Sequence, residues 1–258
     1  METLPGLDVV RAASSPVRAV SVDGTMPTLE VRFSPFDVWY EIDSLWEGTF
    51  LERTQRGAFA KTIKESGDHV RSLFNHGYDP QIGDKVLGKI ENLREDDDTA
   101  IGDVALFDTS YVRDLLPGLE AGQYGSSMRM RVVKETWNDS PEPSDYNPRG
   151  LPERTILEAR LFEFGPVTWP ANPSATAGIR SNVRSMTDDY YERLRSRDPH
   201  RVEELTRMRE ARTLTRDAAA DGTASGDGAA PATDEPGTSH SSGIGNARKR
   251  EALTTHLR

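Results

Sequence analysis

The first half of the chain consists of short strand-like segments separated by turn residues, and this pattern restricts the fold more than any other feature. Segments 17–22 and 28–33 flank the turn "DGTMP", and two further segments flank the acidic run 96–98. Such turns between short apolar segments are typical of β-hairpins. Helices are expected over 56–66 and 109–122 from their apolar spacing and capping residues. The pattern predicts an α+β fold with a mostly antiparallel sheet and a few packed helices.

The character of the chain changes after about residue 181. Residues 186–212 are charged and helix-prone, with an interruption at Pro199, and residues 217–247 contain almost nothing to bury. The second composition is typical of a flexible linker. We therefore expect one domain over 1–181 and a charged helical appendage over 182–215. A disordered linker and short terminal segment are expected over 216–258.

The charge balance and the absence of cysteine exclude several classes of function. The net charge of −10 comes entirely from residues 1–181, and no basic patch is visible, which argues against a nucleic-acid partner. Without cysteine there are no disulfides, thiolate metal sites or cysteine nucleophile. No apolar run approaches the roughly 18 residues of a membrane span, and the N-terminus lacks a secretion signal pattern. We expect a soluble, unsecreted protein with no membrane partner.

Two adjacent serines begin the segment "SSMRMRV". Side chains alternate between the two faces of a strand, so Ser126, Met128 and Met130 share one face, and Ser127 and Arg129 share the other. The apolar face should be turned to the core. Ser127 is then expected on the polar, reachable face, as a candidate nucleophile or as an ordinary solvated serine.

One histidine and one acid stand out beside this serine. His76 ends the predicted strand 70–76, next to a flexible turn. Glu163 ends the apolar face that alternation assigns to Leu157 and Leu161. A carboxylate there needs a partner, for which an imidazole is suited, unless the strand has already left the core. Asp103, which interrupts another apolar strand, is the alternative acid.

On chemistry alone, Ser127, His76 and Glu163 could form a nucleophile, a general base and an orienting acid. A metal site made of His76 with Asp79 and Asp84 has weaker support, because one histidine with two loop acids is a poor divalent-ion signature.

Four segments, in order, resemble the prohead (capsid maturation) serine proteases of tailed bacteriophages, which are distantly similar to the herpesvirus maturation protease, assemblin. They are "GTFLERTQRGAFAKTI", "VRSLFNHGYDPQIGDKVLGKIENLRED", "FDTSYVRDLLPGLEAGQYGSSMRMRV" and "LFEFGPVTWPANPSATAGIRS". The resemblance covers about 30–181 and implies a barrel-like sheet. It implies that Ser127 is the nucleophile and His76 the general base. Glu163 is the third member, although the herpesvirus relative uses a second histidine there and Asp103 stays open.

The resemblance also implies a biological setting. The substrates would be the major capsid protein, a scaffold protein and the enzyme itself, cut within a procapsid in the host cell cytoplasm. No metal or organic cofactor is expected. Backbone N–H groups near Ser127 would stabilise the oxyanion, with Arg129 as a candidate electrostatic helper.

Two other functions remain open at this stage. One is a non-catalytic scaffold or capsid-associated protein on the same fold, which the low apolar content and the tail would also suit. The other is a hydrolase of small esters with the same three residues. The sequence leaves open the cleavage specificity, a homo-oligomeric state and whether self-cleavage removes the tail.

Overall fold

The computed structural model describes residues 3–20, 25–169 and 185–222. The chain divides into two compact units, Met1–Thr215 and Arg216–Arg258. The last helix begins in the first unit and continues through Gly222, beyond the predicted start of the linker at 217. The rest of the predicted tail lies outside the described residues.

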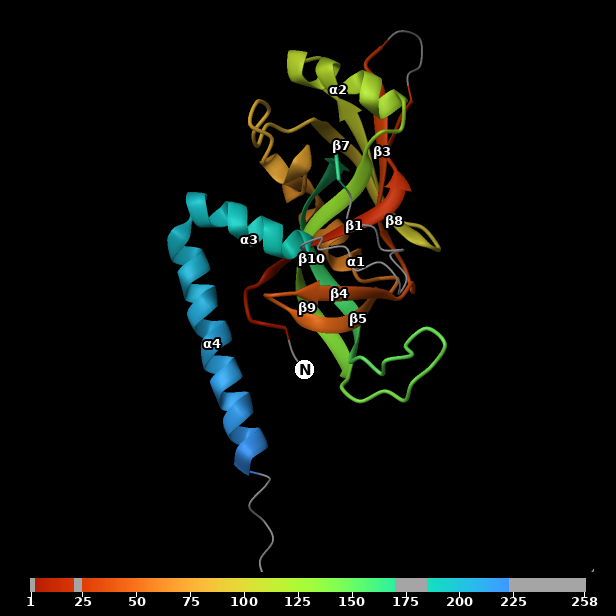
Figure 1. Cartoon of the computed structure of the whole chain (residues 1–258). Coiled ribbons are helices and arrows are strands. Elements are labelled where there is room, and N and C mark those ends of the chain that lie inside the picture. The colour runs from red at the N-terminus through yellow and green to blue at the C-terminus, as the bar shows by residue number, and fades with distance from the viewer. Residues whose placement is uncertain (1–2, 21–24, 170–184, 223–258) are drawn as a thin grey trace, which may run out of the picture. The chain divides into compact units, whose positions relative to one another are not determined.

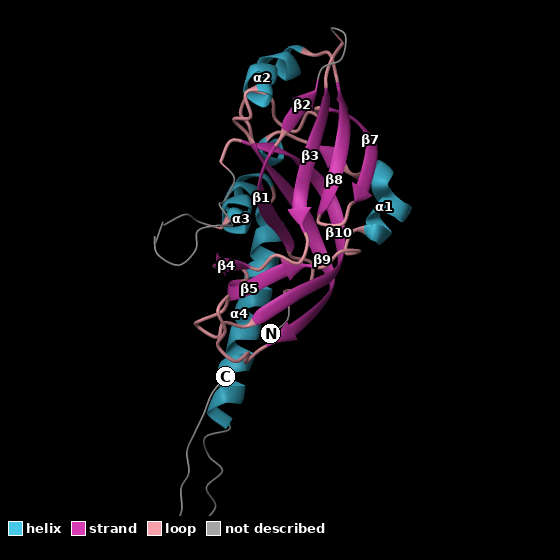
Figure 2. Cartoon of the chain, turned by 90° about the vertical axis from the view of Figure 1, so that its right-hand side faces the viewer, coloured by secondary structure: helices cyan, strands magenta, loops and turns pink. Residues whose placement is uncertain are grey.

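The described strands form two sheets (Figure 2). The first has the order β1 (Asp8–Pro16), β9 (Gly125–Asn138), β10 (Glu153–Val167), β5 (Gly48–Thr54) and β4 (Tyr40–Ser44), with β6 (Arg71–Ser72) beside β10. The second has the order β2 (Arg18–Val20), β3 (Thr28–Pro35), β8 (Thr99–Leu106) and β7 (Gly88–Glu95).

Most strand pairs are antiparallel, as the sequence predicts. The expected hairpin segments pair as β2 with β3 and β7 with β8. Part of the first turn, 21–24, lies outside the described residues. Strand β10 is the exception, because it pairs in parallel with β5 and with β6. The first sheet is therefore mixed.

The barrel implied by the resemblance is not closed among the described strands. The chain passes from the first sheet to the second at Pro16–Val17, but β1 and β4 end one sheet and β2 and β7 end the other. A barrel closes only when its edge strands pair. The outer edge of β1 is instead hydrogen-bonded by side chains of a helix.

The core lies between the two sheets and is built around aromatic rings. Phe33 of β3 stacks on Phe164 of β10 with ring centroids 5.0 Å apart, and Phe59 approaches Phe33 edge-on at 5.6 Å. A Cβ on Gly102 of β8 would lie 2.2 Å from the Phe164 ring, so glycine allows that ring to lie against the sheet. Met128 of β9 is buried in the same core, as alternation predicts.

Four α-helices are described (Figure 1): α1 (Ala60–Ser66), α2 (Ser110–Glu120), α3 (Met186–Arg197) and α4 (Pro199–Gly222). The first is shorter than the predicted 56–66, and the second matches its prediction closely. The predicted interruption at Pro199 separates α3 from α4. No helix in the described part of the chain is long and apolar enough to cross a bilayer.

Candidate active site

Strand β9 is central to the candidate site. Its Ser127 pairs with Ala12 of β1 on one side and with Gly165 of β10 on the other, while Arg129 pairs with Glu163. Directly paired residues of antiparallel strands point to the same side of a sheet. The register therefore gathers Ser127, Arg129 and Glu163 on one face.

A β-bulge in β10 turns Glu163 to this face. Leu161 pairs with the core-facing Met130, whereas Glu163 pairs with Arg129 on the opposite face, and the register shifts between them. A bulge inserts one residue and re-aims the side chains that follow. The expectation that Glu163 shares a face with Leu157 and Leu161 is therefore wrong, and Leu157 itself is 37% exposed.

His76 lies in the 3₁₀ turn η2 (Asn75–Gly77) rather than at the end of a long strand, because the strand predicted over 70–76 is reduced to β6. Its backbone is left-handed, with φ 58° and ψ 24°, and Asn75 has φ 47°. Non-glycine residues adopt this region at a cost that the surrounding structure must offset. Two hydrogen bonds hold this turn. The side-chain oxygen of Asn75 accepts one from the backbone N–H of Thr168 at 3.0 Å, and Arg197 donates the other to the backbone carbonyl of Gly77 at 3.1 Å.

The imidazole of His76 contacts Glu163 directly. Nδ1 lies 2.7 Å from Oε1, and the two side chains are only 10% and 2% exposed. With Nδ1 engaged by a carboxylate, Nε2 is the nitrogen that can accept a proton. Nε2 is buried and has no hydrogen-bond partner among the described residues. An imidazole held in this way can act as a general base.

Ser127 is fully buried, and its hydroxyl is not bonded to His76. Oγ donates to the carbonyl of Arg11 at 2.8 Å, and Sδ of Met186 lies 3.8 Å away. Ser127 lies on the face that alternation predicts, opposite Ser126, but the expectation that it is reachable is wrong, because α3 brings Met186 over it. Ser126 is buried on the core face, as predicted, where its hydroxyl donates to a carbonyl of β3.

Arg129 joins Glu163 to Asp8 of β1. Its Nε lies 3.5 Å from Oε1 of Glu163, and its Nη1 lies 3.1 Å from Oδ2 of Asp8. Burial alone would lower the pKa of Arg129, but Tyr190, Glu163 and Asp8 outweigh it and raise that pKa above its usual value. The site therefore holds a permanent cation beside the carboxylate that contacts the histidine.

The Arg11 carbonyl that accepts from Ser127 belongs to a strand fixed by buried charges. The guanidinium of Arg11 lies 2.6 Å from Glu52 and 2.7 Å from Glu47, and Arg154 contacts the same two carboxylates. Burial alone would raise the pKa of Glu52, but Arg11 and Arg154 lower it to about 2. This cluster ties β1 to β5 and β10.

The alternative residues lie in other surroundings. Asp103 is in the second sheet, where its carboxylate contacts Arg94 and accepts from Asn92. Asp79 accepts two backbone N–H groups of its own turn. In the described part of the chain, no three His, Asp or Glu side chains lie close enough together to hold a metal ion. Glu163, not Asp103, is the acid beside His76.

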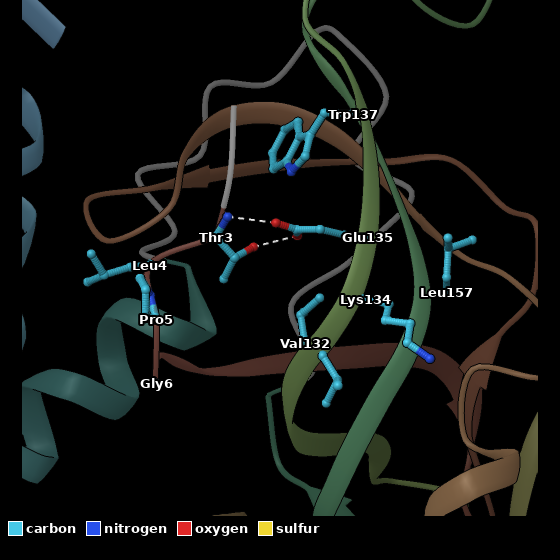
Figure 3. A pocket seen from close by; sticks show the side chains of 10 residues that line it. Thr3, Leu4, Pro5, Gly6, Val132, Lys134, Glu135, Trp137 and Leu157 are labelled. Atoms are coloured by element: carbon cyan, nitrogen blue, oxygen red, sulfur yellow. Dashed lines mark hydrogen bonds between the residues drawn. The ribbon is translucent and has the colours of Figure 1, made fainter.

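A cavity of about 750 Å³ lies elsewhere, between the segment Thr3–Gly6 and strands β9 and β10 (Figure 3). Its carboxylate, Glu135, accepts from the backbone N–H of Thr3 at 2.7 Å and from its hydroxyl at 2.6 Å. No serine or histidine is among the described residues that line it. The described lining of this cavity therefore offers no serine–histidine pair, in contrast to the face that carries Ser127 and His76.

A buried imidazole–carboxylate pair, with a serine on the same face of the adjoining strand, defines a candidate serine-hydrolase site. The model of the Caudovirus prohead serine protease family matches residues 18–189, two thirds of the chain. The chain belongs to this family of phage serine proteases.

Among solved structures, the chain is similar to the bacteriophage T4 capsid assembly protease, gp21. The two are 15% identical with a TM-score of 0.41, and the match covers 63% of this chain and 98% of that one. No curated protein matches the chain.

Proposed function

We propose that Ser127 is the nucleophile, His76 the general base and Glu163 the orienting acid of a peptidase that processes capsid proteins. The observation that carries this assignment is the 2.7 Å contact between Nδ1 of His76 and Glu163, which leaves Nε2 buried and without a partner among the described residues. Membership of the prohead serine protease family supplies the class of reaction.

The reaction begins when the hydroxyl of Ser127 turns from the Arg11 carbonyl towards His76. Nε2 accepts its proton while Oγ attacks the scissile carbonyl carbon, and the carbonyl electron pair moves to oxygen. Collapse of this intermediate breaks the C–N bond, and the imidazolium gives its proton to the leaving amine. A water molecule then loses a proton to Nε2, attacks the acyl ester and restores the serine.

Backbone N–H groups near Ser127 are the expected oxyanion donors. Arg129 was the other candidate, but its contacts with Glu163 and Asp8 favour a role in holding the acid. As a positioning residue, Arg129 would act on the reaction through Glu163.

The substrates follow from the family. We propose the major capsid protein, the scaffold protein and the chain itself, cut inside a procapsid in the host cell cytoplasm. Residues 1–181 would form the protease domain. The segments after it would be the parts that self-cleavage can remove.

The test is co-expression with the major capsid protein of the same phage, read by intact mass. Wild type and Ser126→Ala are expected to shorten both the capsid protein and the 28.6 kDa chain, whereas Ser127→Ala leaves both at full length. Equal trimming in all three would identify a contaminating protease. Full-length products in all three would favour a structural protein of this family.

A further inference from the structure

Helix α3 covers the proposed nucleophile. It lies beside β1 in both views (Figure 1, Figure 2), and its first residue, Met186, brings Sδ to 3.8 Å from Oγ of Ser127. A scissile carbonyl carbon must come within about 3–3.5 Å of that hydroxyl to react. The Met186 side chain holds this space, and Ser127 has no exposed surface.

The same helix occupies the free edge of β1. The hydroxyl of Thr187 accepts from the Val10 N–H at 3.1 Å, and the Tyr191 hydroxyl accepts from the Asp8 N–H at 2.8 Å and donates to the Asp8 carbonyl at 3.1 Å. Unpaired backbone groups of an edge strand are those to which an extended peptide binds by strand addition. Side chains of α3 therefore satisfy the free backbone groups of β1 and hold the helix against the strand next to Ser127.

Both ends of α3 are anchored around the site. Near its start, the buried carboxylate of Asp188 accepts from the Ser44 hydroxyl at 2.7 Å and from the Leu45 N–H at 3.0 Å. At its end, Arg197 donates to the carbonyl of Gly77, the residue that follows His76. The helix thus connects to the His76 turn while covering Ser127.

We propose that α3 is an intramolecular inhibitor of this protease. Its Met186 occupies the space over Ser127 and its first turns cover the outer edge of β1, and peptide bonds are cleaved only after it has left. This inference rests on the proposed function, because it assigns a regulator to the same nucleophile. It also gives the charged helices that follow the protease domain a specific use.

The test compares two acids that are neighbours in the first turn of α3. Asp188→Ala removes the bonds to Ser44 and Leu45. Asp189→Ala removes the same charge from the same turn, but Asp189 is exposed and no described residue bonds its carboxylate. Both variants therefore lose the same favourable interaction between a first-turn carboxylate and the helix dipole, and they differ in the bonds to Ser44 and Leu45.

The measurement is the rate at which a fluorophosphonate labels Ser127 in the full chain. Asp188→Ala is expected to be labelled about tenfold faster than wild type, because buried charge-assisted bonds are lost. Asp189→Ala is expected to match wild type. The amide hydrogen of Val10 should exchange faster in Asp188→Ala but not in Asp189→Ala, because this N–H donates to the hydroxyl of Thr187 in α3.

A second variant keeps the test decisive if loss of Asp188 unfolds the chain. Met186→Ala uncovers Ser127 without removing an anchoring bond, and it too should be labelled faster. Equal labelling of wild type, Asp188→Ala and Met186→Ala would overturn the inhibitor and leave the proposed function standing. No labelling of Ser127 in any of them would reject both.

Discussion

Nδ1 of His76 lies 2.7 Å from Oε1 of Glu163, although 87 residues separate the two in the sequence. Two local irregularities produce this contact: a left-handed backbone at His76 and a bulge in β10 before Glu163. The left-handed backbone places the His76 ring, and the bulge turns Glu163 towards that ring while Phe164 stays in the core. Strained backbone and bulges of this kind are frequent at functional sites.

Glu163→Gln should lower kcat by about 10²–10⁴-fold, because the amide keeps the shape of the side chain but no longer stabilises the imidazolium or fixes its tautomer. The measurement is the steady-state rate of capsid-protein cleavage at equal enzyme concentration.

Glu158→Gln is the matched control, since Glu158 lies in the same strand but contacts Lys61 and Lys134. It should keep the wild-type rate. Equal losses in the two variants would mean that Glu163 has no special relation to the histidine.

Arg129→Gln should lower kcat by about tenfold with little change in KM, because the cation that holds Glu163 is lost. Arg129→Lys should recover part of the rate. Arg131→Gln is the control: Arg131 also contacts Asp8, at 2.6 Å, but its described contacts do not include Glu163. A rise in KM alone, or no rescue by lysine, would contradict a positioning role.

Gly165→Ala should destabilise the fold by about 1–3 kcal/mol, the usual range for overpacking. A Cβ there would lie 2.0 Å from the Leu73 carbonyl oxygen, so backbone would have to move beside Ser127. Gly67→Ala, whose Cβ would meet nothing nearer than 4.0 Å, should be tolerated. Urea unfolding measures the stability of the two variants. Equal stability would contradict the prediction, because it would show that the backbone at Leu73 can move away from a Cβ at position 165 without cost.

Acid should unfold the protein partly through Glu52. Its pKa falls from 4.5 to about 2 on folding, so its stabilisation is fully present above pH 4.5 and is lost as the pH falls through about 2. In Glu52→Gln, the free energy of unfolding should depend less steeply on pH across this window. Urea titrations at several pH values, with Glu41→Gln at an exposed ion pair as control, test this. If the free energy of unfolding of Glu52→Gln depends on pH as steeply as that of wild type, Glu52 does not contribute to acid unfolding.

The period-two pattern of β9 could be read from sequence because it is a local property. Ser126, Met128 and Met130 face the core since apolar side chains at alternate positions have only one way to be buried together. The partnership of Glu163 with an imidazole was also predictable, but by an incorrect route, because a bulge leaves no clear trace in the sequence.

Long-range packing determined what the sequence did not predict. Strand β1 is not predicted from the sequence, since Arg11 interrupts its apolar run. Among the described residues, the charge of Arg11 is paired with Glu47 and Glu52 of a distant segment. The burial of Ser127 depends on Met186, 59 residues further along the chain. Such contacts become visible only when the strands and α3 are placed together.

The most direct test of the account is the position of a fluorophosphonate adduct, mapped by mass spectrometry after digestion of the labelled chain. The account predicts an adduct on Ser127 in wild type and in the control His69→Ala, and its loss in His76→Ala. An adduct on another serine, or undiminished labelling of Ser127 in His76→Ala, would contradict it.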